Sequence, residues 1–185
     1  MHAPGAGLST QLSAWRSERT KRMEIKEIMS RPAVTCRPED TLNTAAQRMW
    51  EHDCGVLPVI DDDDSLVGMI TDRDICMAAY SRGEALAAIR VSDAMATQAF
   101  SCHAEDSVQA AERLMADKQI RRIPIVERDN QPIGVLSLND IARHHATEQK
   151  AALDRELVST LAAICQPRPQ QQGQQAHQTQ PQMQH

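Results

Sequence analysis

Two motifs in this chain place a hydroxyl and a carboxylate three residues apart, Thr71 with Asp74 and Ser137 with Asp140. Each begins with a glycine and follows the pattern Gly-x-x-Thr/Ser-x-x-Asp at the end of an apolar run. A carboxylate can accept two hydrogen bonds from a ribose diol, and a hydroxyl beside the free N–H groups of a helix start can hold a phosphate. The same spacing is also a capping box, in which the two side chains serve only the helix. Both interpretations stay open for one motif alone, and its recurrence favours binding.

The motif recurs because the chain contains an internal repeat. Residues 28–75 align without a gap on residues 94–141, at a constant offset of 66. This offset pairs Pro58 with Pro124 and Cys36 with Cys102. A unit of this size is too small to bury a core of its own, so two copies are expected to stack about a pseudo-two-fold axis. Any ligand site should then occur in duplicate, in a paired cleft.

Hydrophobic periodicity predicts the order β-α-β-β-α in each repeat, which is an α/β (α+β) fold. The first helix of each repeat follows Asp40 or Asp106, which are candidate N-caps. The four aspartates at 61–64 lack the ligand spacing of a calcium loop and predict a solvated hairpin turn. The expected elements are extended runs at 33–36, 56–60 and 66–71 with a helix from Asp72, and at 99–102, 123–126 and 133–137 with a helix from Leu138.

Composition along the chain predicts five segments. Both ends carry little apolar sequence to bury, and the C-terminal end is rich in Gln. After the repeats we expect an amphipathic helix that packs on the body or on a partner subunit, with an apolar stripe formed by Leu153, Leu157, Leu161 and Ile164. The segments are a disordered leader at 1–22, the first repeat at 23–84, the second repeat at 85–146, the amphipathic helix at 147–166 and a disordered tail at 167–185.

Overall composition argues against several classes of protein. A net charge of −5 and an aromatic content of 2% disfavour a nucleic-acid partner, which needs a basic stripe or stacking platforms. The start of the chain has no apolar signal region, and no run approaches the 18 apolar residues that span a bilayer. Five scattered cysteines without a CxxC pair suit a reducing compartment. We therefore expect a cytoplasmic protein without a membrane partner.

These features together resemble a known family. The twofold β-α-β-β-α pattern, the hydrophobic-Pro-hydrophobic runs at 56–59 and 122–125 and the paired Gly-x-x-Thr/Ser-x-x-Asp endings resemble a tandem CBS-domain pair, or Bateman module, over residues 25–144. The stretches TDRDI, IRRIPIV and LAAICQP are similar to the small stand-alone bacterial members, including the mycobacterial hypoxic response type. Nothing in the chain resembles an attached enzyme, channel or transporter.

The resemblance implies a non-catalytic regulatory module that binds AMP, ADP, ATP, NAD or S-adenosylmethionine in up to two clefts and signals to an unknown regulated protein, usually as a homodimer. By position, Asp74 and Asp140 would bind the ribose hydroxyls, and Thr71 and Ser137 would contact ribose or phosphate. No obligatory cofactor or metal is implied. The resemblance further implies two adenine slots, one lined by Val34, Thr35, Val56, Leu57 and Pro58 and the other by Phe100, Ser101, Ile123 and Pro124.

Three arginines are candidate phosphate ligands, because a guanidinium can bind phosphate oxygens in a bidentate fashion. They are Arg73, Arg121 and Arg122. Their alternative role is as surface or dimer-contact residues. If only one site binds a phosphorylated ligand, the side bearing Arg121 and Arg122 is favoured, because the equivalent residues of the first repeat, Gly55 and Val56, are apolar.

Two other functional classes remain as alternatives. Cys36 and Cys102 stand at equivalent positions, with His52 and His103 elsewhere in the repeats, which fits a redox- or metal-responsive stress protein. Buried free cysteine is, however, common as a small apolar filler. An enzyme is not expected, because no nucleophile elbow, P-loop, HExxH or paired-cysteine motif is found.

Overall fold

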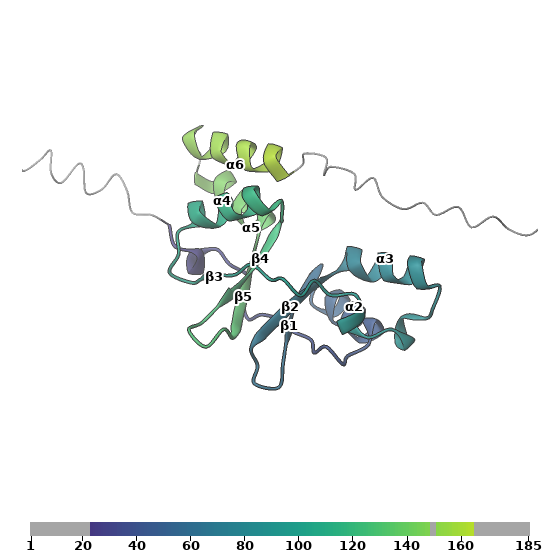
Figure 1. The fold of residues 1–185 in the computed structure, drawn as a ribbon. Coiled ribbons are helices and arrows are strands. Elements are labelled where there is room, and N and C mark those ends of the chain that lie inside the picture. Colours follow the sequence, from purple (N-terminus) through teal and green to yellow (C-terminus); the bar gives the residue numbers. More distant parts are fainter. Residues whose placement is uncertain (1–22, 149–150, 165–185) are drawn as a thin grey trace, which may run out of the picture.

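The computed structural model describes residues 23–148 and 151–164. Two units lie side by side, each with an antiparallel hairpin and two helices, and the two hairpins project in the same direction (Figure 1). The α/β (α+β) class and the pairing of two repeats are confirmed. The first unit consists of α2 (Leu42–Glu51), β1 (Val56–Ile60), β2 (Leu66–Thr71) and α3 (Asp72–Arg82).

The second unit repeats this order with one additional short strand. Strand β3 pairs in parallel with β4, which pairs antiparallel with β5, whereas the first unit has the two-stranded β1–β2 sheet. In the first unit, Cys36 makes only an isolated parallel bridge to Val59. The elements of the second unit are β3 (Cys102–His103), α4 (Val108–Lys118), β4 (Arg122–Val126), β5 (Pro132–Ser137) and α5 (Leu138–Glu148). Short 3-10 turns lie at Ile25–Glu27, Leu86–Ala88 and Val91–Asp93.

The first helix of each repeat begins one residue later than expected. Thr41 and Ser107 are the N-caps, and their side chains accept hydrogen bonds from the backbone N–H groups of Thr44 and Ala110. The prediction of aspartate caps is therefore wrong. The carboxylates of the aspartates close the preceding turn instead, because Asp40 and Asp106 accept from the N–H groups of Arg37 and His103 at 2.9 and 2.8 Å. Asx turns of this kind compete with capping for the same side chain.

The segments that lead into the repeats are exchanged between the two cores. Ile25 and Met29 belong to the core of the second unit, whereas Ile89 and Val91 belong to the core of the first. Each segment also pairs with a strand of that unit, Ser30 with Val135 and Met69 with Ala96. Neither unit completes its core from its own repeat alone, which explains why the repeat occurs as a pair.

The glycine that opens each motif makes this exchange sterically feasible. A Cβ at Gly68 would lie 2.7 Å from the carbonyl oxygen of Ala96, and a Cβ at Gly134 would lie 2.8 Å from that of Ser30. These glycines therefore allow a close backbone approach. The approaching backbone is the protein's own exchanged segment.

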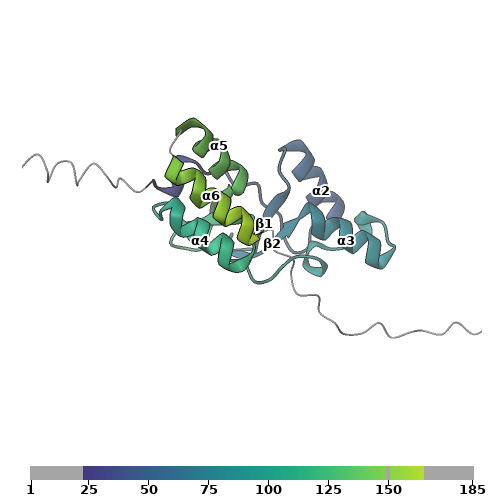
Figure 2. The ribbon, with the colours of Figure 1, turned by 90° about the horizontal axis from the view of Figure 1, so that it is seen from above.

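The C-terminal helix differs from its expected bounds. Helix α5 continues to Glu148, and a separate helix α6 (Ala151–Ile164) follows and packs on α4 and α5. Figure 2, seen from above, shows α6 lying across these two helices. The leader at 1–22 and the tail at 167–185 lie outside the described residues. Within the part of the chain that the structure describes, none of the helices is both long enough and apolar enough to cross a bilayer.

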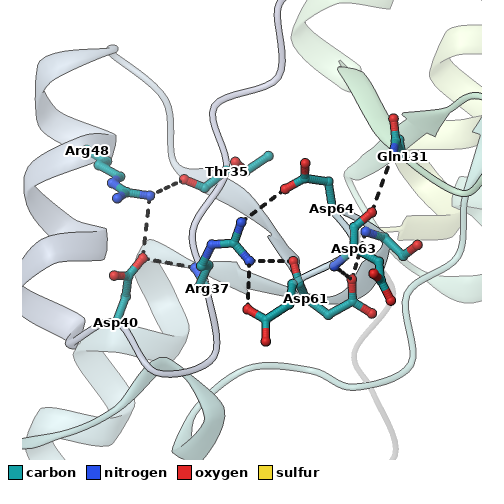
Figure 3. A network of polar contacts seen from close by, with 10 residues as sticks. Thr35, Arg37, Asp40, Arg48, Asp61, Asp63, Asp64 and Gln131 are labelled. Atoms are coloured by element: carbon teal, nitrogen blue, oxygen red, sulfur yellow. Dashed lines mark hydrogen bonds and ion pairs between the residues drawn. The ribbon is translucent and has the colours of Figure 1, made fainter.

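The aspartate-rich turn between β1 and β2 is closed by an arginine (Figure 3). Arg37 donates to the carbonyl oxygen of Asp61 at 2.5 Å and forms ion pairs with Asp62 and Asp64. The carbonyl of Asp63 accepts from the side chain of Gln131 in the neighbouring hairpin at 3.4 Å. The expected hairpin turn is thus found, with its negative charge balanced in part by Arg37 and its tip joined to the second unit.

Candidate functional site

A cleft of about 580 Å³ lies between the two units. This volume is in the range of sites for small organic ligands. Both repeats contribute to the lining, through the β2–α3 junction of the first and the start of β4 in the second. The lining residues are Val56, Met69, Thr71, Asp72, Arg73, Asp74, Ala96, Gln98, Ala99, Phe100, Gln119, Ile120, Arg121, Arg122, Pro124 and Ile164.

The motif of the first repeat lies on this cleft. Thr71 caps α3 in a capping box, in which Oδ2 of Asp74 accepts from the N–H and the hydroxyl of Thr71 at 2.9 and 2.6 Å. The hydroxyl oxygen of Thr71 in turn accepts from the N–H of Asp74 at 3.2 Å. Among the described residues, Oδ1 of Asp74 has no hydrogen-bond partner. Capping therefore occupies one oxygen of this carboxylate and leaves the other as an acceptor.

The motif of the second repeat is differently connected. Oδ2 of Asp140 accepts from the N–H and the hydroxyl of Ser137 at 2.8 and 2.5 Å, as in the first repeat. Its Oδ1 accepts from the hydroxyl of Ser30 at 3.2 Å and forms an ion pair with Arg143. Asp140 is also 5% exposed, and the cavity beside Ser137 has a volume of only about 250 Å³. The two motifs, alike in sequence, are therefore unequal as ligand sites.

The candidate arginines converge on the larger cleft. Arg73 lines it from the first repeat, and Arg121 and Arg122 line both this cleft and the smaller cavity. A Cβ at Gly55 would lie 2.9 Å from Nη2 of Arg122, which places this guanidinium against the first repeat. Three guanidinium groups outnumber the carboxylates of Asp72 and Asp74 in the lining, so the cleft suits an anionic group.

Residues from the two expected adenine slots line one common cleft. Val56, from one expected slot, lines the same cleft as Phe100 and Pro124, from the other. Leu57 and Ile123 are fully buried in the first and second cores. The remaining members of the expected slots do not line the cleft in this structure, and they are Val34, Thr35, Pro58 and Ser101. The cleft is therefore composite, with an apolar part drawn from both repeats.

Several lining residues were not expected from the sequence. Met69 is half-buried and alternates with buried residues of β2, so its place on the other face of the strand is consistent with strand periodicity. Gln119, at the end of α4, has a left-handed backbone (φ 52°). Its neighbour Lys118 places its ammonium 5.3 Å from the centroid of the Phe100 ring. Ile164 was expected on an apolar stripe, but its sequence pattern carries no signal that places it at the cleft.

The cysteines at equivalent positions lie in separate cores. Cys36 is buried in the first core and Cys102 in the second. Burial, together with the charge of Asp40, raises the pKa of the Cys36 thiol from 9.0 to about 12, although Arg48 opposes the shift. Burial and Asp106 raise the pKa of Cys102 from 9.0 to about 11. The described residues contain no group of three or more His, Cys, Asp or Glu placed to hold a metal ion.

Comparison with known sequences gives a clear relative. Hypoxic response protein 1 of Mycobacterium tuberculosis (strain ATCC 25618 / H37Rv) is 34% identical over 143 residues, which cover 77% of this chain and 94% of that protein. The crystal structure of Hypoxic Response Protein I with two coordinated zinc ions is 33% identical, with a TM-score of 0.59, and the match covers 66% of this chain and 98% of that one.

Two further solved structures share the fold. The CBS domain pair of protein MJ0100, in complex with 5-methylthioadenosine and S-adenosyl-L-methionine, has a TM-score of 0.63 at 24% identity and covers 69% of this chain and 98% of its own. CBSX2 in complex with AMP has a TM-score of 0.60 at 23% identity, with the same two coverages.

The family model of the CBS domain matches this chain twice, at residues 25–81 and 91–146. The two matches coincide with the two structural units, each of which carries one hydroxyl–carboxylate motif. On this evidence the chain belongs to the CBS-domain family, as a tandem pair of CBS domains.

Proposed function

We propose that this CBS-domain pair binds one adenosyl ligand in the cleft formed by both repeats. The observation that carries the proposal is Oδ1 of Asp74, which has no hydrogen-bond partner among the described residues. It lies at a helix start that Thr71 caps, on the border of a cleft of about 580 Å³. A carboxylate with one free oxygen can accept from a ribose hydroxyl without breaking the capping box. The aliphatic and aromatic part of the lining, Val56, Phe100 and Pro124, would contact the adenine.

A phosphorylated adenosyl ligand fits this cleft better than an uncharged one. Arg73, Arg121 and Arg122, which line the same cleft, would bind phosphate oxygens. AMP, ADP, ATP and NAD carry phosphate groups, whereas S-adenosylmethionine and 5-methylthioadenosine do not. AMP is bound by CBSX2, and S-adenosylmethionine by protein MJ0100. We expect this chain to prefer the phosphorylated ligands.

The output of binding is regulatory. CBS-domain pairs are generally regulatory rather than catalytic, and we propose that the ligand changes the angle between the two units and that a partner protein responds to this change. The units are joined by exchanged segments and by the hairpin tips. A ligand that contacts both repeats would therefore change the angle between them.

We further propose that the chain forms a homodimer through α2 and α3. In the second unit, α6 covers the equivalent helices α4 and α5, whereas in the first unit Trp50 and Tyr80 are 88% and 83% exposed. Large exposed aromatic side chains are typical of interfaces. Two of the four aromatic residues of the chain lie on these two helices, which is a strong bias in a sequence with so few.

A calorimetric panel tests the proposed function. The full chain is titrated with AMP, ADP, ATP, NAD, S-adenosylmethionine and adenosine, and in parallel as the Asp74→Asn variant. We expect binding by the phosphorylated members at a stoichiometry of one per chain, and weakening by about 10- to 100-fold in the variant, because charge-assisted hydrogen bonds to the ribose are lost. The absence of any binding at millimolar ligand to the folded protein would contradict the proposal.

The redox or metal alternative through Cys36 and Cys102 has less support. The two thiols lie in different cores and their pKa values are raised, which disfavours the reactive thiolate. The zinc ions of Hypoxic Response Protein I keep a metal assay relevant. Zinc analysis and thiol counting on protein purified without a His-tag separate the two: bound zinc or oxidised thiols would favour the alternative.

A further inference from the structure

The end of the C-terminal helix reaches the cleft. Leu157 packs against the second core, and Ile164, at the last position of α6, belongs to that core and is 6% exposed. Ile164 also lines the cleft that carries Thr71 and Asp74. In Figure 2 the yellow C-terminal end of α6 points toward the first unit. A helix outside the two repeats thus contributes a wall to the site between them.

Helix α4 holds this end of α6 in place. The side-chain amide of Gln119, the C-cap residue of α4, donates to the carbonyl oxygen of Ala163 at 3.4 Å. Gln119 itself lines the cleft. One turn before Ile164, Leu161 lines the smaller cavity beside Ser137. The last turn of α6 therefore borders both cavities, and its position is set by a residue of the larger one.

We propose that α6 is part of the ligand site, with Ile164 as an apolar contact of the adenosyl ligand, so that ligand binding and the seating of α6 on α4 stabilise each other. This inference rests on the proposed function. A ligand that touches Ile164 gains this contact only in molecules whose α6 is seated, and by linkage the ligand then favours the seated helix by the same factor. The state of the cleft is thereby transmitted to the last turn of α6.

The first arm of the test measures affinity. The full chain is titrated with the tightest binder among AMP, ATP, NAD and S-adenosylmethionine, as wild type, Ile164→Ala and Val158→Ala. Val158 is the matched control, because it lies on the same helix, is 64% exposed and does not line the cleft. We expect Ile164→Ala to weaken binding by about tenfold, through the lost apolar contact and the loosened helix. Val158→Ala should change the affinity less than about twofold, as surface substitutions usually do.

The second arm needs no change in α6, so its comparison in the wild-type chain does not depend on the folding of an α6 variant. Hydrogen exchange of backbone amides in α6 is followed in the wild-type chain with and without the ligand, and again in Asp74→Asn. We expect the ligand to slow exchange at 157–164 by about three- to tenfold in the wild type, and to slow it less in the variant at the same ligand concentration.

The outcomes separate this inference from the proposed function. If the wild-type chain binds a ligand that Asp74→Asn weakens, but either arm fails, α6 is not part of the site and the proposed function stands. If the wild-type chain binds none of the ligands, the proposed function is wrong and the inference is wrong with it.

Discussion

Asp74 and Asp140 occupy equivalent positions in the two repeats but differ in what their second carboxylate oxygen does. Oδ1 of Asp140 accepts from Ser30 and pairs with Arg143, whereas Oδ1 of Asp74 has no partner among the described residues. Ser30 belongs to the segment that the first repeat exchanges into the second unit. Its counterpart, Ala96, has no side-chain donor to offer Asp74. The difference between Ser30 and Ala96 thus contributes to the difference between Asp140, whose carboxylate is fully paired, and Asp74, whose carboxylate keeps one open oxygen.

This difference predicts unequal effects on stability. We expect Asp140→Ala to lower the free energy of unfolding by about 3 kcal/mol, because it leaves the partners of a buried carboxylate unsatisfied. Asp74→Ala should lower it by only about 1 kcal/mol, the usual cost of losing part of a capping box. Urea denaturation followed by circular dichroism measures both. Equal losses would contradict the assignment of Asp140 as the structural member of the pair.

Arg122 should discriminate among ligands by their charge. Arg122→Ala is expected to weaken AMP binding by about 10-fold or more while leaving adenosine within about twofold, because only AMP carries a phosphate that the guanidinium would bind. Arg128→Ala is the matched control, since Arg128 is exposed in the β4–β5 turn and does not line the cleft. Calorimetry at two salt concentrations checks this. Equal losses of affinity for AMP and for adenosine would mean that Arg122 acts on folding or packing and not on the phosphate.

The sequence is informative wherever a local rule decides the outcome. Short apolar runs bounded by turn residues predict the strand limits at Val56–Ile60 and Leu66–Thr71 and the helix starts at Asp72 and Leu138. The structure confirms them. The first helices start one residue later than predicted, because the aspartate and the hydroxyl residue beside it compete for the cap and the aspartate serves the turn.

The packing of segments that are far apart in the chain is harder to predict from the sequence. An alignment of repeats shows which residues are equivalent, but not in which unit each copy packs, so the exchange of Met29 and Ile89 between the cores could not be predicted. The composite cleft is a consequence of this exchange, because residues 96–100 lead from the bridge between Ala96 and Met69 of β2 into the second repeat. The place of Ile164 depends on the packing of α6, which apolar periodicity alone does not fix.

The glycines that open the motifs should be sensitive to a single methyl group. Gly68→Ala and Gly134→Ala place a Cβ 2.7 and 2.8 Å from a backbone oxygen of the exchanged segments, and we expect each to lower the free energy of unfolding by about 2 kcal/mol. Gly55→Ala is the control, because the atoms it approaches are the ends of the flexible side chains of Asp72 and Arg122. Its cost should be below about 1 kcal/mol. Thermal unfolding ranks the three, and a larger loss for Gly55→Ala than for Gly68→Ala would contradict the steric explanation.

The buried thiols should be unreactive at neutral pH. With pKa values of about 12 and about 11, Cys36 and Cys102 are almost fully protonated at pH 8, and the thiolate is the form that alkylating reagents attack. Cys76, which is exposed, should react with iodoacetamide before Cys36 and Cys102 in the native protein, and mass spectrometry of peptides identifies the modified sites. Fast modification of Cys36 under native conditions would revive the redox alternative.

The same shifts predict how stability depends on pH. Because folding raises the pKa of these thiols above the ordinary value of 9.0, the folded state binds their protons more tightly than the unfolded state. Their contribution is therefore fully present below pH 9 and is lost as the pH rises toward about 11 and then about 12. We expect the free energy of unfolding to fall over this window, and to fall less steeply in Cys36→Ala. The same slope in both proteins would mean that other groups cause the loss.

The exposed aromatic residues predict a dimer that depends on the first unit. Trp50→Ser with Tyr80→Ser should convert the proposed homodimer into monomers, because the double substitution removes two large apolar side chains from the α2–α3 face. Val158→Ser is the control, since Val158 is also exposed but lies on α6. Sedimentation velocity at several concentrations distinguishes the species. A wild-type chain that sediments as a monomer, or a double variant that remains dimeric, would rule out this interface, and unchanged AMP binding by the variant monomer would show that the cleft is complete within one chain.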